Sequence, residues 1–126
     1  MKDKVKRGIG LRYAISGLKI AFKEEKNFRI HLVIAIIVIM LSIVLQISRI
    51  EWLFVLLAIH LVFITELLNS VAERLIDYIK PDIHPLAGAI KDIAAAIVLV
   101  ASLMSIFVGC IVFIPKLLAL FFSFNV

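Results

Sequence analysis

The sequence predicts an all-α integral membrane protein, with an N-terminal amphipathic helix on the membrane surface and three transmembrane helices. Of its 126 residues, 63% are hydrophobic and 18% are charged, whereas soluble domains are about 45 to 50% apolar. Three long apolar runs follow a basic N-terminal segment. The length fits one domain, and we expect residues 1–126 to form it without an appended soluble module.

Residues 1–29 are the predicted surface region, and most of the 14 basic residues of the chain lie there. Within it Arg12, Ser16, Lys19 and Lys23 recur at helical spacing, while apolar side chains occupy the neighbouring face. This pattern is typical of a helix that lies on a membrane. The basic face suits two partners, the phosphate groups of a ligand and anionic lipid headgroups, and the sequence does not separate them.

Three apolar runs are long enough to cross a bilayer. The predicted spans cover about residues 30–47, 50–79 and 89–114. The second is longer than the hydrocarbon thickness at about 1.5 Å per residue, so its last turns should stand out of the bilayer. Proline interrupts helices, so we expect Pro85 to lie in the loop before the third span and Pro115 to end that span.

A polar seam ends the second apolar run. Glu66, Asn69 and Glu73 fall at i, i+3 and i+7, with Asp77 on the same stripe, and therefore share one helix face. A charge near the bilayer centre costs on the order of 3 kcal/mol, so intramembrane acids are candidates for a functional site. The alternative is that the helix leaves the bilayer here and its acids are solvated.

The distribution of charge predicts the orientation in the plasma membrane. The charged residues lie mostly on the side of the N-terminus, and only Arg49, Glu51 and Lys116 fall on the other side. The positive-inside rule then predicts a cytoplasmic N-terminus and an extracytoplasmic C-terminus. The polar seam and the basic segment therefore meet at one cytoplasmic interface.

Acids and bases at a water–lipid boundary suit phosphoryl transfer from a nucleotide to a lipid hydroxyl. Mg²⁺ takes one or two carboxylates and completes its shell with water and phosphate oxygens, and Glu25 and Glu73 are candidates for that role. Glu66, the deeper acid, is the candidate general base. The sequence has no Gly-rich phosphate loop that ends in Lys-Ser or Lys-Thr. The expected partners are ATP, a lipid alcohol and the bilayer, and no nucleic acid.

The run Glu-x-x-Asn-Ser-x-x-Glu at residues 66–73 resembles the signature of the prokaryotic membrane diacylglycerol kinase and undecaprenol kinase family. Glu25 followed by Phe28 and Arg29, and Gly88 followed by Lys91 and Asp92, occur in the order and spacing of that family. The resemblance covers nearly the whole chain. It implies a homotrimer of protomers that each have one surface helix and three transmembrane helices, with active sites shared between neighbours.

The resemblance also implies roles for single residues. By this resemblance, Glu66 corresponds in position to the catalytic base of the family and Asn69 to the hydrogen-bonding neighbour of that base. Glu25 and Glu73 correspond to the carboxylates that hold Mg²⁺ and ATP. Nucleotide contacts are implied at Lys6 or Arg7, Tyr13, Asp82, His84, Lys91 and Asp92. Lipid contacts are expected at Lys19, Phe22, Asn27 and His31, together with Glu66.

The identity of the lipid substrate rests on residues 23–31, which are similar to the Gram-positive branch of the family, whose members prefer undecaprenol. The first prediction is therefore an undecaprenol kinase, and the alternative is a diacylglycerol kinase with the same mechanism. A hypothesis from another class is a non-enzymatic membrane protein whose acids pair with Arg74 and Lys91 to hold an oligomer together.

Overall fold

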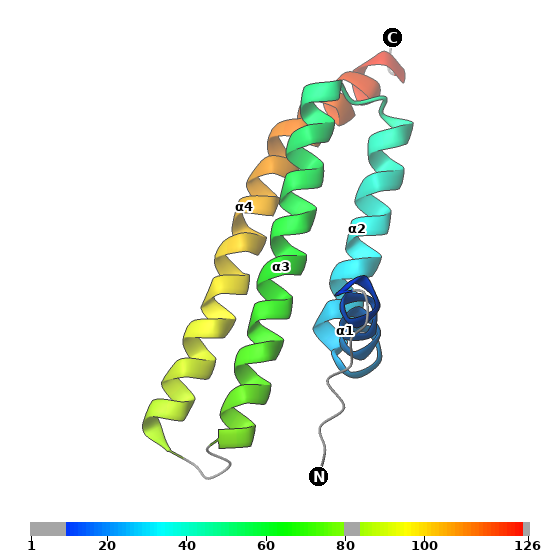
Figure 1. Cartoon of the computed structure of the whole chain (residues 1–126). Coiled ribbons are helices and arrows are strands. Elements are labelled where there is room, and N and C mark those ends of the chain that lie inside the picture. The colour runs from blue at the N-terminus through cyan, green and yellow to red at the C-terminus, as the bar shows by residue number, and fades with distance from the viewer. Residues whose placement is uncertain (1–9, 80–83, 125–126) are drawn as a thin grey trace.

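The structure is a computed structural model that describes residues 10–79 and 84–124. Its described residues form four helices in chain order (Figure 1). Their bounds are α1 Gly10–Glu24, α2 Lys26–Val44, α3 Arg49–Ile79 and α4 Pro85–Phe124. The helices α2, α3 and α4 are each long and apolar enough to cross a membrane. A short N-terminal helix followed by three candidate spans is the predicted arrangement.

The helix α1 crosses the bundle instead of running along it. In Figure 1 it is seen nearly end-on beside the first turns of α2. Glu25 separates the two helices with extended backbone angles, φ −99° and ψ 111°. The guanidinium of Arg29 donates to the carbonyl oxygens of Phe22 and Lys23, at 2.9 Å and 3.0 Å. A cation on the last carbonyls of α1 stabilises that helix end and fixes the corner.

The first span differs from its predicted range of 30–47 at both ends. It begins at Lys26, because the chain turns at Glu25 and the next residues already bond as a helix. It ends at Val44, since Leu45 and Gln46 form a turn in which Gln46 has a positive φ of 49°. Hydropathy alone did not locate these boundaries because apolar residues continue into the turn.

The third span is longer than the predicted 89–114, and the prediction that Pro115 ends it is wrong. Pro85 opens α4, where the missing N–H of proline costs no helix bond. Nδ1 of His84 accepts a hydrogen bond from the backbone N–H of Leu86 at 3.2 Å. At the other end α4 continues through Pro115 to Phe124 and bends in its last turns (Figure 1). Proline bends a helix without ending it when membrane and neighbouring helices support both sides.

The bundle has an apolar cluster at the end opposite α1, which we call the Lys116 end. Ile47, Val55, Val112 and Phe113 are buried together there, from the α2–α3 turn, α3 and α4. Glu51 is held by two partners at the same end. Its Oε2 lies 3.1 Å from Nζ of Lys116 and accepts a hydrogen bond from the backbone N–H of Ser48 at 2.7 Å. The hydroxyl of Ser48 in turn accepts from the N–H of Glu51 at 3.3 Å, which is a capping box at the start of α3.

Candidate active site

The depth of the polar seam follows from the length of α3. Glu66 lies 15 residues and Glu73 lies 22 residues after Glu51, so they are about 22 Å and about 33 Å further along the helix. Glu51 and its partner Lys116 mark one boundary of the hydrocarbon, whose thickness is about 30 Å. Glu66 therefore lies just inside the far edge of the hydrocarbon, and Glu73 lies at the boundary itself.

Glu66 is the most buried acid of the described residues, with 3% of its surface exposed. Its Oε2 is 3.8 Å from Nε2 of His31 on α2, which is beyond hydrogen-bond distance. Among the described residues no lysine or arginine forms an ion pair with it. A carboxylate that is buried without a cationic partner is costly, so it needs an explanation other than stability.

Asn69, one turn further along α3, is also buried and only half-satisfied. Its side-chain N–H donates to Oε1 of Glu73 at 3.2 Å. Its carbonyl oxygen, Oδ1, is buried with no hydrogen-bond partner among the described residues. An unsatisfied buried acceptor costs about 1 to 3 kcal/mol and is uncommon in native proteins. It therefore marks a place where a ligand can supply a donor.

Glu25 brings the surface helix to α3. Its Oε1 accepts from the hydroxyl of Ser70 at 2.8 Å and from Arg74 at 2.9 Å, and Arg74 also reaches Oε2 of Glu24 at 2.9 Å. The hydrogen bond from Ser70 lowers the pKa of Glu25, burial opposes this, and Arg74 lowers the pKa further. Glu25 therefore stays ionised at neutral pH and holds the α1–α2 corner against α3.

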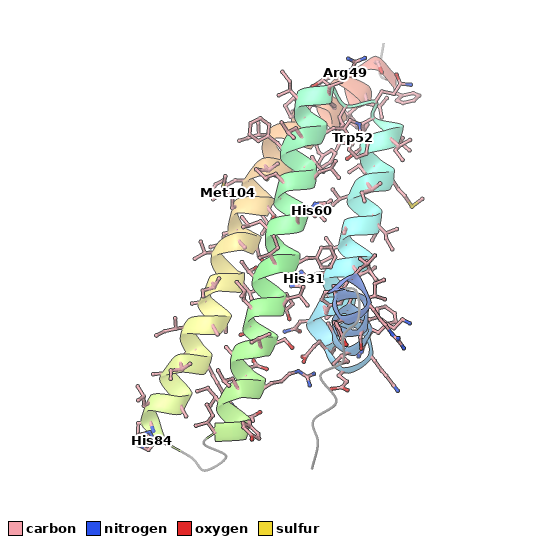
Figure 2. All side chains as sticks on the ribbon, viewed as in Figure 1. His31, Arg49, Trp52, His60, His84 and Met104 are labelled. Carbon is pink, nitrogen blue, oxygen red and sulfur yellow. The ribbon has the colours of Figure 1, made fainter. Side chains whose placement is uncertain are left out.

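Five of the predicted site residues come together in what we call the carboxylate cluster. Its members are Glu25 from the corner, His31 from α2, and Glu66, Asn69 and Glu73 from α3. His31, Glu25 and Glu73 all lie close enough to Glu66 to act on it electrostatically. Figure 2 shows His31 between α2 and α3, beside α1. One face of α3 thus carries Glu66, Asn69 and Glu73, and the corner and α2 bring Glu25 and His31 beside it.

The remaining candidates of α1 and α2 lie on the surface near this cluster. Tyr13, Lys19 and Phe22 are exposed on α1, and Asn27 is exposed in the first turn of α2. Lys19 and Phe22 line a shallow hollow with Arg29, which the corner hydrogen bonds hold in place. A basic and aromatic hollow at this depth suits a lipid headgroup or a phosphate, the two partners that the sequence left open.

The α4 candidates are not part of the cluster. His84 caps α4, Lys91 forms an ion pair with Asp77, and Asp92 is exposed. Figure 2 shows His84 at the start of α4, on the other side of α3 from α1. Within one chain His84 therefore lies on the other side of α3 from α1, whereas Lys91 reaches Asp77 on the stripe that carries Glu66 and Glu73. Lys6, Arg7 and Asp82 lie outside the described residues.

Comparison with known proteins identifies this arrangement. Residues 12–113 match the protein family that is described as "Prokaryotic diacylglycerol kinase". The chain belongs to the prokaryotic diacylglycerol kinase family. It is therefore a lipid kinase of the membrane, and the alternative of a non-enzymatic membrane protein is excluded. A kinase family implies ATP as the phosphoryl donor.

Individual relatives in the family carry two names. An undecaprenol kinase of Bacillus subtilis is 39% identical over 95 residues, which cover 75% of this chain and 77% of the relative. A diacylglycerol kinase of Synechocystis is 36% identical over 113 residues, which cover 89% of this chain and 65% of the relative. The diacylglycerol kinase of Escherichia coli K12 is 31% identical over 99 residues, which cover 79% of this chain and 81% of the relative.

The carboxylate cluster of this lipid kinase fits Mg²⁺ that arrives with a nucleotide. No group of three acidic, histidine or cysteine side chains among the described residues is arranged to hold a metal by itself. Mg²⁺ does not need such a cage, because phosphate oxygens and water supply most of its six ligands. Ser70 and Arg74 both donate to Oε1 of Glu25, and Glu73 accepts from Asn69 through Oε1. Each carboxylate thus has an oxygen that the described bonds do not use.

Sequence reasoning missed the residues that hold Glu25 in position. Ser70 and Arg74 donate to it from successive turns of α3, and Glu24 shares Arg74. The spacing of Ser70 and Arg74, at i and i+4, could have predicted this arrangement, because both side chains must share one face of α3. The ion pairs of Arg74 and Lys91 that the non-enzymatic alternative expected do exist, but within one chain.

An apolar cleft lies between α2, α3 and α4 and has a volume of about 340 Å³. Its lining includes His31, Ala35, Ala58 and Phe63 on one side and Ser105 and Gly109 on α4. His31 thus borders both this cleft and the carboxylate of Glu66. A volume of this size is within the range of ligand pockets.

Proposed function

We propose that this lipid kinase transfers the γ-phosphoryl group of ATP to the hydroxyl of undecaprenol, at the cytoplasmic face of the plasma membrane. The observation that carries the proposal is Glu66, a buried carboxylate without a lysine or arginine partner, placed just inside the hydrocarbon edge. A lipid hydroxyl lies at that depth while its tail stays in hydrocarbon. The similarity to an undecaprenol kinase of Bacillus subtilis supports the choice of lipid.

Glu66 is the general base in this proposal. It accepts the proton of the lipid hydroxyl while the hydroxyl oxygen forms a bond to the γ-phosphorus, and the bond from that phosphorus to the bridging oxygen of ADP breaks. The proton then resides on Glu66, and water takes it up after the products leave. The free Oδ1 of Asn69 is an acceptor for the protonated carboxyl or for the incoming hydroxyl.

Glu25 and Glu73 are the residues that would hold Mg²⁺ and thereby the nucleotide. When bound, the metal neutralises charge on the β- and γ-phosphates. Ser70 and Arg74 position Glu25, and Asn69 positions Glu73, so both carboxylates are oriented before the nucleotide arrives. Orientation of this kind lowers the entropy lost on binding.

The lipid tail would follow the apolar cleft, with the hydroxyl near His31 and Glu66. Lys19, Phe22 and Asn27 would contact the part of the lipid nearest the surface, since they lie on the surface side of the corner.

A homotrimer with shared active sites would account for the separation of His84 from the carboxylate cluster, because a neighbouring protomer would bring the start of its α4 there. The outer face of α3 supports such an assembly. Its exposed residues Leu53, Leu57, His60, Ile64, Leu68 and Val71 recur at steps of three and four, which is typical of helix packing. An exposed histidine at this depth points toward a protein partner instead of lipid.

The second candidate function is diacylglycerol phosphorylation, because relatives of that name match this chain over similar lengths. Both lipids present a primary hydroxyl at the same depth. A side-by-side assay decides between them: the purified chain in vesicles, with ATP and Mg²⁺, receives undecaprenol or dioleoylglycerol at equal mole fraction.

We expect the kcat/KM for undecaprenol to exceed that for dioleoylglycerol. The reverse ratio would assign the diacylglycerol activity instead, and absence of product from either lipid would contradict the proposed reaction. The Glu66→Gln variant in the same vesicles is the control for contaminating kinases.

A further inference from the structure

We infer that residues 117–124, the last turns of α4, lie within the leaflet at the Lys116 end as an anchor surrounded by lipid, instead of projecting into water. This segment lies outside the family match, which ends at residue 113. The inference does not depend on the proposed substrate or on the orientation of the protein in the membrane.

The first argument is length. The helix α4 has 40 residues, so its axis is about 60 Å long, twice the hydrocarbon thickness. Lys116 pairs with Glu51 and marks the boundary at this end. A straight continuation would carry residues 117–124 about 12 Å beyond that boundary. The helix instead bends in its last turns and leans across the end of the bundle (Figure 1).

The bend has a local cause in Pro115. Proline lacks the N–H that would bond to the preceding turn, and its ring crowds the carbonyl four residues back. Lys116 follows directly, with a flexible side chain that reaches Glu51 while its backbone turns away from the span. The sequence Pro-Lys therefore both changes the direction of the helix and keeps one charge at the boundary.

The second argument is composition. Residues 117–124 contain no charged side chain, and six of the eight are leucine or phenylalanine. These large side chains are 43% to 81% exposed, with Leu117 at 43% and Phe124 at 81%. The hydroxyl of Ser123 is bonded to the carbonyl oxygen of Leu120 at 2.7 Å, so the lone polar side chain is satisfied within the helix. A helix that is apolar on every side is buried in protein or in lipid.

Because the apolar side chains lie on every side of residues 117–124, lipid and not a second copy of the chain is the expected surrounding of this segment. A partner helix covers one stripe and leaves the opposite side in water, whereas Leu118 and Leu120 are both exposed and, at i and i+2, point to nearly opposite sides of the helix. Surface helices that rest among headgroups have a polar face, and this segment has none. The segment therefore lies below the headgroups, at the outer edge of the hydrocarbon.

Depth-dependent fluorescence quenching tests this placement. The chain has one tryptophan, Trp52, so a Trp52→Phe background accepts a single new probe. Phe122→Trp reports on the segment, and Phe124→Trp is a second probe in case the first variant does not fold. Phe107→Trp is the matched reference, because Phe107 is exposed on α4 about 14 Å inward from Lys116.

The full-length variants are placed in phosphatidylcholine vesicles that contain lipids brominated close to the headgroup or near the chain end. We expect the shallow bromines to quench Phe122→Trp at least about twofold more than the deep ones, and the order to reverse for Phe107→Trp, with little quenching by aqueous iodide. Strong iodide quenching would place the segment in water, and protection from every quencher would place it against another protein. Deep quenching equal to that of Phe107→Trp would place the segment near the bilayer centre instead of at the edge of the hydrocarbon; each of these outcomes overturns the inference.

Discussion

The two ends of the bundle treat their charged groups in opposite ways. At the Lys116 end, Glu51 is paired with Lys116 and bonded to Ser48, and it lies beside a buried apolar cluster. At the end that carries α1, Glu66 is buried without a lysine or arginine partner among the described residues, and Oδ1 of Asn69 has no hydrogen-bond partner among them. The polar groups named at the Lys116 end all have partners, whereas in the described part of the chain Glu66 lacks a lysine or arginine and Oδ1 of Asn69 lacks a donor. Unused buried polarity is what a ligand site needs and what a stable core avoids.

The α1 end also contains ion pairs, among them Lys91 with Asp77. Arg74 pairs with both Glu24 and Glu25 and thereby holds the α1–α2 corner against α3. The Arg74–Glu25 pair resembles Glu51–Lys116 in geometry, yet it positions a predicted metal ligand. The comparison therefore predicts that equal chemical changes at the two ends will have unequal effects on catalysis.

The largest effect is expected for Glu66→Gln. The amide keeps the shape and removes the basicity, so turnover should fall by on the order of a hundredfold or more, the usual size of general-base catalysis. ATP affinity should change little, because other carboxylates hold the nucleotide. Turnover by single-turnover phosphoryl transfer and ATP affinity by equilibrium binding are the two measurements. Weaker ATP binding at unchanged turnover would remove Glu66 from the role of base.

The next effect is expected for Glu25→Gln and Glu73→Gln. Each change removes one negative oxygen ligand, so the Mg²⁺ and ATP concentrations at half-maximal rate should rise on the order of tenfold, which corresponds to about 1.4 kcal/mol. Glu51→Gln at the Lys116 end is the matched control and should titrate as the parent does. If all three variants respond alike to Mg²⁺, the metal is bound elsewhere.

A core change at the Lys116 end should affect stability and spare catalysis. Phe113 is 8% exposed within the apolar cluster. Phe113→Ala leaves a cavity there and should lower the midpoint of thermal unfolding by about 3 °C or more. Phe107→Ala on the same helix is the control, since Phe107 is 65% exposed and faces lipid. Loss of turnover in folded Phe113→Ala would show that the two ends are coupled.

The smallest effect concerns pH and the corner. Because Ser70 and Arg74 lower the pKa of Glu25 below its ordinary 4.5, ionised Glu25 contributes its stabilisation above that pH. The contribution is lost as pH falls through the lowered pKa. Spin labels at Ser16→Cys and Leu75→Cys in a Cys110→Ala background should keep their distance at pH 5 and separate only as the pH falls through this lowered pKa. The same labels with Glu25→Gln should show no such transition.

The sequence predicted the polar seam because its spacing and its cost in a membrane are both local properties. Glu66, Asn69 and Glu73 share one face of α3 at any tertiary arrangement, so a helix was enough to group them. The family match supports the lipid kinase prediction as well. The helix count followed from hydropathy, which measures length and polarity only.

What the sequence did not predict depends on geometry between elements. The hydrogen bonds of Arg29 to α1 and of Ser70 to Glu25 join segments whose mutual position is set by the corner. Pro115 was expected to end a helix because that rule describes water-exposed helices, where no membrane supports the freed carbonyl. Hydropathy and spacing likewise did not show that α3 lies between His84 and α1 within one chain.

The most direct test of the account is the sidedness of the two ends. If the α1 end is catalytic, it faces the cytoplasm, where ATP is present, and the Lys116 end faces outward. In a Cys110→Ala background, a membrane-impermeant thiol reagent is applied to intact cells that carry Ser48→Cys or Tyr78→Cys, both at exposed positions near opposite ends of α3. The account predicts labelling of Ser48→Cys in intact cells and labelling of Tyr78→Cys only after the membrane is opened. The reverse pattern would put the carboxylate cluster in a compartment without ATP and contradict the proposed kinase site.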